Sequence, residues 1–189
     1  MSTRTGGDLN LVKPELTDDH KVTIGTDLPA NFQKIDDEFS AHLADDVHIG
    51  LNPACAVYNN VGISIPNNVW TDITFNSETY DNAAMHSTST NTNKIVVPVA
   101  GKYLAVAKVA FSNTSETGYR GAILYKNDTP MDRFICYAVA GFYTYINLVT
   151  VINMAVNDYV KVQAIQSSGG ALNVEYSDSY PALIVMRIA

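Results

Sequence analysis

Alternation of apolar and polar residues is the dominant pattern from residue 54 onward. Its clearest example is Lys94–Phe111, in which a β-branched run ends at Pro98 and a second strand follows Gly101. In that second strand every other residue is apolar on one face, whereas Leu104 and Val106 lie between two lysines on the other. A period of two residues is typical of β-strands. We therefore expect two strands joined by a tight turn, with the second strand able to be covered on both faces.

The same alternation continues to the end of the chain, interrupted by Gly, Pro, Asn and Asp and without a helical segment. Strands at such even spacing favour a sandwich or jelly roll over an α/β fold. The expected fold class is mostly β: a ten-stranded jelly-roll sandwich over residues 51–189, preceded by an extended arm and one short helix. The ten strands are expected near residues 54–58, 69–75, 94–99, 102–111, 120–126, 132–139, 142–153, 159–166, 171–176 and 182–188.

Residues 27–50 are expected to form a short helix followed by a hinge. Pro29 suits the first helical turn. A helix this short with a narrow apolar stripe is only marginally stable by itself. We therefore predict that three copies of the helix pack through this stripe in a coiled coil. The alternative is docking of the helix on its own β-domain. The stripe consists of Leu28, Phe32, Ile35, Phe39 and Leu43.

Residues 1–26 lack periodicity and carry apolar residues singly. A segment of this kind cannot bury itself and orders only against a partner. We therefore expect an extended anchoring arm, with a floppy tail as the alternative. Its expected anchors are Leu9, Leu11, Val12, Pro14 and Leu16.

Composition and charge exclude several classes of partner. The net charge is −7, and 16% of the residues are charged, without a cluster of Lys and Arg. A nucleic-acid ligand is therefore not expected, because such a chain cannot replace the counterions of a phosphate backbone.

No apolar run is long enough for a membrane span, and no hydrophobic leader follows Met1, so we expect assembly in a cytoplasm. Cys55 and Cys136 lack metal-pair spacing and are expected to be buried apolar residues, although a disulfide stays open.

The sequence carries no recognised catalytic motif, and we expect neither an enzyme nor a cofactor. The carboxylates of Asp36, Asp37 and Glu38 point around the helix and are expected to be solvated. Threefold copies of His42 or His48 near an axis could hold a metal ion, but exposed side chains at a helix end are the favoured interpretation. No metal site is therefore predicted.

The segment Asn76–Asn93 is long for a jelly-roll connection and is rich in hydroxyl, amide and aromatic groups. Such groups suit sugars, which stack on rings and form hydrogen bonds with neutral groups. The alternative is a solvated loop. The candidate receptor-binding residues are Tyr80, Asp81, Asn82 and His86.

A series of short motifs in the β-region resembles the globular head of the tumour necrosis factor and complement-q family. One position departs from the family, since Asn157 stands where Gly usually precedes the aspartate. The resemblance implies a jelly roll that forms a compact trimer around aromatic and aliphatic side chains. The expected interface rings are Tyr103, Tyr143 and Tyr145, with burial inside one domain as the alternative. The motifs are Trp70-x-x-Ile73-x-Phe75, Tyr80-Asp81, Val97-Pro98-x-x-Gly101-x-Tyr103, Val109-x-Phe111, Arg120-x-x-Ile123, Lys126-Asn127, Asn157-Asp158-x-Val160-x-Val162 and Ala182-Leu183-x-Val185.

The N-terminal part, with Leu9–Pro14 followed by Asn31–Asp36, is similar to the opening of many tailed-phage fibre and baseplate proteins. This resemblance implies a homotrimer on the virion surface that binds other virion proteins through its arm. The expected function is a structural fibre or spike whose head contacts the host surface, with polysaccharide as the candidate receptor. A capsid decoration or head fibre that stabilises the shell or aids loose adhesion is the alternative, and a depolymerase is a third hypothesis without paired carboxylates to support it.

Overall fold

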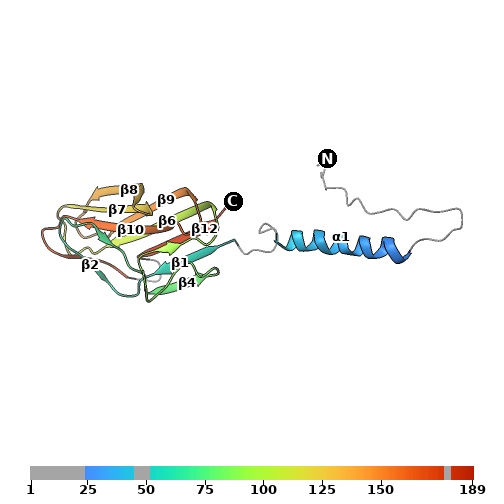
Figure 1. The fold of residues 1–189 in the computed structure, drawn as a ribbon. Helices are drawn as coiled ribbons and strands as arrows, with labels where there is room; N and C mark the ends of the chain where they lie inside the picture. Colours follow the sequence, from blue (N-terminus) through green and yellow to red (C-terminus); the bar gives the residue numbers. More distant parts are fainter. Residues whose placement is uncertain (1–23, 45–51, 177–179) are drawn as a thin grey trace. The chain divides into compact units, whose positions relative to one another are not determined.

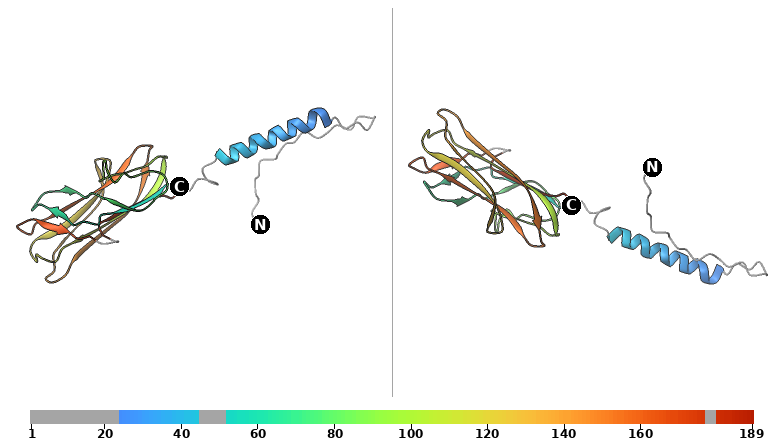
Figure 2. Two further views of the ribbon diagram at one scale, coloured as in Figure 1. Left: turned by 90° about the horizontal axis from the view of Figure 1, so that it is seen from below. Right: turned by 90° about the horizontal axis from the view of Figure 1, so that it is seen from above.

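The computed structural model describes residues 24–44, 52–176 and 180–189. The chain divides into two compact units, Met1–Gly50 and Leu51–Ala189, and each is described by itself. We call the second unit the head. Figure 1 shows the helix of the first unit and the strands of the head, and Figure 2 shows the same elements from two further sides. The predicted anchor residues and the hinge at residues 45–50 lie outside the described residues.

The described element of the first unit is a helix, α1 (Ile24–Ala44). It begins before Pro29, so the prediction that this proline occupies the first turn is wrong. A proline near the start of a helix removes one backbone hydrogen bond but leaves the rest of the helix intact, which explains why the helix tolerates it. The carboxylates of Asp36 and Glu38 are exposed, and the Gln33 amide donates a hydrogen bond to Asp37 Oδ1 (2.9 Å). Among the described helical residues, none forms a stretch long and apolar enough to cross a bilayer.

The described part of the head contains strands only, in two antiparallel sheets that form a sandwich, so the predicted fold class is confirmed. Two short strands, β2 and β4, were not predicted, and the expected strand 69–75 is reduced to the two residues of β3. The strands are β1 (Ala54–Tyr58), β2 (Ile63–Ile65), β3 (Thr71–Asp72), β4 (Ser77–Asp81), β5 (Ile95–Val96), β6 (Gly101–Phe111), β7 (Tyr119–Lys126), β8 (Thr129–Tyr137), β9 (Thr144–Met154), β10 (Tyr159–Gln166), β11 (Leu172–Val174) and β12 (Ala182–Arg187).

The seven-stranded sheet is built around β6. Its strand order is β2-β11-β6-β12-β1-β4, and β9 also pairs with β6 along the full length of both strands. The five-stranded sheet has the order β3-β10-β7-β8, with β5 paired to β10. Strands that are neighbours in space but distant in sequence are typical of a jelly roll.

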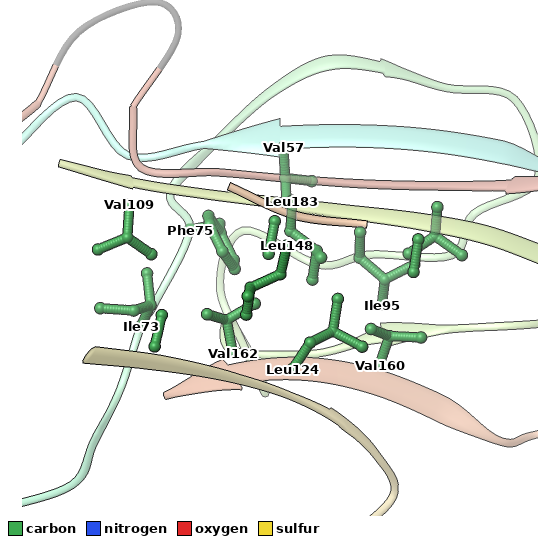
Figure 3. Packing of buried hydrophobic residues seen from close by; sticks show 14 of the residues in the cluster. Val57, Ile73, Phe75, Ile95, Val109, Leu124, Leu148, Val160, Val162 and Leu183 are labelled. Carbon is green, nitrogen blue, oxygen red and sulfur yellow. The ribbon is translucent and has the colours of Figure 1, made fainter. Parts of the chain in front are cut away.

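The core lies between the two sheets. Residues on the inner side of the longer strands β6, β7, β9 and β10 are almost completely buried because these strands alternate between the core and the surface. Figure 3 shows side chains of the two sheets meeting in this layer, with Val57, Leu148 and Leu183 from one sheet and Leu124, Val160 and Val162 from the other.

Two turns at one end of the sandwich are joined by an amide–carboxylate pair. Asn127, with a positive φ of 53°, donates through Nδ2 to Asp158 Oδ1 (2.9 Å) and accepts from the Tyr159 N–H (3.0 Å). The other oxygen of Asp158 accepts from the Ala155 N–H (2.7 Å) and forms an ion pair with Lys126 (3.0 Å). The Asn127 hydrogen bond, followed by those from Ala155 and Lys126, lowers the pKa of Asp158 to about 2.

Candidate functional site

The outward side of the seven-stranded sheet is apolar and exposed. In β6 the core side is occupied by Tyr103 and the alternate residues after it, so Leu104 and Val106 point away from the core. The strand register places Leu104 opposite both Val151 and Met186, and Val106 opposite both Val149 and Ile184. Residues paired in this way lie on the same side of a sheet. We call these six residues the apolar sheet face: Leu104, Val106, Val149, Val151, Ile184 and Met186.

Exposure of the valines in this surface is high. Val149 is 58% exposed and Val151 is 54% exposed. Polar rows flank the surface, because the same register pairs Lys102 with Asn153 and Lys108 with Asn147. An apolar centre with a polar rim is the usual arrangement of a protein–protein interface.

Aromatic rings extend the apolar sheet face at one end. Tyr145 lies opposite Ala110 on β6, and its ring centroid is 6.2 Å from that of Tyr143 and 5.2 Å from that of Tyr180. The Tyr180 ring lies 5.9 Å from the Lys108 ammonium. Tyr143 and Tyr145 are both exposed, so their predicted role at a subunit interface stays a prediction.

Tyr103 belongs to the core instead. Its side chain is completely buried within one chain, and its hydroxyl donates a hydrogen bond to the Val99 carbonyl (2.8 Å). This burial raises the pKa of its hydroxyl. The assignment of Tyr103 to the trimer interface is therefore corrected. Its neighbours Leu104 and Val106 lie on the outward side of β6 instead. The sequence indicated them because they are apolar residues on the face of the strand opposite its core-facing residues.

A second exposed apolar surface lies at the edge of the sandwich. The end of β8 and the connection from β8 to β9, which passes from one sheet to the other, expose several large apolar side chains. We call this group the apolar edge: Phe134, Tyr137, Val139 and Phe142. The apolar edge and the apolar sheet face are different surfaces of the same chain.

The helix α1 presents the central part of the predicted stripe. Phe32 is 64% exposed, Phe39 is 60% exposed, and Ile35 between them is also exposed. The side chains of Leu28 and Leu43 lie outside the described ones. Three large apolar residues on one face of a helix, all open to solvent, are what a coiled-coil partner would cover.

The predicted receptor loop is instead held together by its own polar groups. Asp81, the last residue of β4, accepts hydrogen bonds from the N–H groups of Ala83 (3.1 Å) and His86 (2.9 Å). Asn82 accepts from the Ala54 N–H (2.8 Å) and donates to the Asn52 carbonyl (3.1 Å). These contacts give Asp81 and Asn82 a structural role at the start of the head.

His86 has a similar internal role. Its imidazole is fully buried, with Nδ1 2.9 Å from Glu78 Oε1 and Nε2 3.3 Å from the Thr92 carbonyl. The assignment of His86 to a receptor site is therefore corrected, because its imidazole is buried, whereas the receptor role of Asp81 and of the exposed Asn82 stays a prediction. Tyr80 differs, since it is exposed and lies opposite Ala56 on the outward side of the seven-stranded sheet.

Metal-binding groups do not gather anywhere in the described part of the chain: no three His, Cys, Asp or Glu residues there could share an ion. The side chain of His42 and the whole of His48 lie outside it. Both cysteines are free thiols, Cys55 buried and Cys136 half-buried. Burial raises the pKa of each thiol.

Comparisons with known proteins agree with this architecture at the level of fold. No protein-family model and no curated protein matches the chain. Murine APRIL in a crystal at pH 5.0 matches with a TM-score of 0.57 at 12% identity, over 72% of this chain and 99% of that chain. The globular domain of a zebrafish complement 1qA protein matches with a TM-score of 0.53 at 15% identity, over 72% and 98%.

A third solved structure, Eiger TNF from S. frugiperda, matches with a TM-score of 0.54 at 9% identity, over 73% of this chain and 93% of that chain. At identities this low the likeness shows the fold alone. The head of this chain thus has the jelly-roll fold of tumour necrosis factor and complement-q domains.

Proposed function

We propose that this chain is a non-enzymatic structural protein that works as a homotrimer, a fibre or spike of a phage virion whose head contacts the host surface. The observation that carries the proposal is the apolar sheet face, with Val149 and Val151 each more than half exposed. Soluble monomers rarely expose a contiguous apolar patch of this kind, because each exposed apolar side chain forgoes the free energy of burial.

The proposed partner is a second copy of the same chain. Contact between the apolar edge of one subunit and the apolar sheet face of the next would bury both surfaces. Because the two surfaces differ, this contact is heterologous, and a heterologous contact that closes on itself forms a ring. Three is the proposed number of subunits, since the family that the sequence resembles forms trimers and the stripe on α1 suits a three-stranded coiled coil.

The virion role rests on the N-terminal resemblance to phage fibre and baseplate proteins. The arm at residues 1–26 is the proposed anchor, α1 the proposed trimerisation helix, and the head the proposed contact with the host. Labelled antibody on purified particles tests this role. Signal at tail structures supports a fibre or spike, whereas signal spread over the capsid shell, or absence from particles, contradicts it.

Substitution of one valine tests the proposed interface. Val149→Asp places a charge in the apolar sheet face, and we expect it to shift the full chain from trimer to monomer in size-exclusion chromatography with light scattering. Val61→Asp is the matched control, because Val61 is 57% exposed but lies in the connection between β1 and β2. If both variants keep the wild-type mass, or both lose it, the apolar sheet face is not the interface.

A further inference from the structure

The outward side of the five-stranded sheet carries a polar row that crosses four strands. Asp72 on β3 lies opposite Gln163 on β10, Gln163 lies opposite Ile123 on β7, and Ile123 lies opposite Arg133 on β8. The neighbouring residues on β7 and β10 face the core, so these four lie on the outer side of the sheet. Figure 1 shows β10, β7 and β8 side by side.

A hollow of about 360 Å³ lies at the β8 end of this row. It is formed where the register between β7 and β8 shifts: Leu124 pairs with Asp132 and Tyr125 with Pro130, which leaves Met131 without a partner on β7. An extra residue of this kind bends a strand locally and redirects its side chains. The hollow is lined by Ile123, Pro130, Met131, Asp132 and Arg133.

The hollow has an apolar floor, and polar groups of the adjoining row are already positioned beside it. Ile123, Pro130 and Met131 supply the apolar surface. At the side, Gln163 Nε2 donates to Asp72 Oδ1 (2.8 Å), and Asn93 Nδ2 donates to Asp72 Oδ2 (2.7 Å). These bonds fix the amide and the carboxylate before any ligand arrives, which lowers the entropy cost of binding.

Arg133 is the group in this row with unused hydrogen-bonding capacity. Its side chain is exposed, and among the described residues its guanidinium has neither an ion-pair nor a hydrogen-bond partner. Lys161 nearby is engaged, because its ammonium is 3.0 Å from Asp128 and 5.4 Å from the centroid of the Tyr125 ring. A guanidinium offers five N–H donors in a fixed plane, which suits an array of hydroxyl acceptors.

We propose that this hollow and the adjoining row bind a short neutral saccharide. The apolar floor fits the C–H face of one sugar ring, whose hydroxyls Arg133 can reach as a donor, and Gln163 and Asp72 fit the hydroxyls of the next ring along the row. A phosphate or an acidic sugar fits poorly, because the hollow has no excess of positive charge: its lining carries one carboxylate, Asp132, and one guanidinium, Arg133.

This site rests on the proposed function in one respect. In the proposed trimer the apolar edge takes up part of β8, but Phe134 pairs with the core-facing Ala122, whereas Arg133 pairs with Ile123 on the outer side of the sheet. The hollow beside Arg133 then stays free to contact a polysaccharide on the host surface. The proposal gives the host-contact role a specific location, at the β7–β8 side of the head instead of the 76–93 segment.

Saturation-transfer difference NMR on the full-length protein tests the proposal. The probes are the methyl glycosides of glucose, galactose and N-acetylglucosamine at millimolar concentration, with glucuronic acid as the charged comparison. We expect saturation transfer to at least one neutral glycoside. Arg133→Ala, which removes the free donors, and Met131→Trp, which fills the hollow, should each weaken binding at least tenfold. The control variants Glu116→Ala and Val61→Trp change exposed residues outside the site and should bind as wild type does.

The proposal is overturned if no neutral glycoside receives saturation, if glucuronic acid binds more tightly than every neutral sugar, or if neither site variant weakens binding. Sedimentation of the same samples separates this result from the fate of the trimer. A trimer that binds no sugar rejects the saccharide site alone, whereas a monomer rejects the proposed assembly.

Discussion

At the scale of single residues, polar side chains in the head act mainly as internal braces. Asp158 and Asn82 each connect segments that are distant in sequence, and His86 connects Glu78 with Thr92 inside its own loop, through contacts of 2.7 to 3.3 Å. In the sequence, such residues look like ligand-binding groups because their type and their position in turns are the only visible signals. Only the three-dimensional contacts show that their hydrogen-bonding capacity is already used.

Asp158 gives the head an acid-sensitive contribution to stability. Its pKa is lowered to about 2, so the contribution is fully present above the usual aspartate pKa of about 4 and is lost as the pH falls towards 2. We expect Asp158→Asn to lower the free energy of unfolding by about 1 to 3 kcal/mol at pH 7. The difference between wild type and variant should shrink below pH 4, as measured by urea unfolding across pH. A constant difference down to pH 2 would contradict this assignment.

Gly118 and Gly141 form a matched pair for testing a close backbone approach. Both have positive φ, +76° and +74°, but a Cβ at Gly118 would collide with the Ser167 carbonyl, whereas nothing lies near one at Gly141. We expect Gly141→Ala to cost about 1 to 2 kcal/mol from backbone strain alone. Gly118→Ala should cost more because Ser167 must also move, and thermal unfolding of the two variants measures the difference. Equal costs would mean that this part of the head relaxes freely.

At the scale of elements, the longer strands could be predicted from sequence because alternation over eight or more residues is a strong signal. The strand β2 could not, since three residues are too few to show a period, and the bounds of β3 were overestimated for the same reason. The strand β4 (Ser77–Asp81) is polar and forms because β1 offers it a partner. The apolar sheet face was only partly visible. Leu104 and Val106 showed an apolar second face on β6, but their contact with the exposed valines of β9 depends on register, which the sequence does not reveal.

The helix α1 is expected to contribute to association independently of the head. Replacing Phe32 and Phe39 together with Ser removes the two most exposed apolar residues of its described part. We expect this double variant to dissociate at a protein concentration at least tenfold higher than wild type in analytical ultracentrifugation. Near-UV circular dichroism of the head tyrosines should be unchanged. Unaltered dissociation would show that the helix stripe is not a subunit contact.

At the scale of the whole molecule, one feature explains the exposed apolar surfaces of both units. The apolar sheet face, the apolar edge and the stripe on α1 are each incomplete in one chain, and each would be completed by further copies of that chain. Burial of these surfaces in a homotrimer accounts for a chain with few charged residues that exposes many large apolar side chains. It also leaves the hollow beside Arg133, on the outer side of the five-stranded sheet, free for the proposed saccharide contact.

Sedimentation equilibrium of the full chain at micromolar concentration tests this central claim most directly, because it measures mass without reference to shape. A homotrimer has three times the 20.6 kDa mass of the chain. We predict that this mass persists across a tenfold dilution. A mass equal to that of one chain would contradict the account, because the exposed surfaces would then have no partner, and a stable dimer would contradict the proposed ring of three.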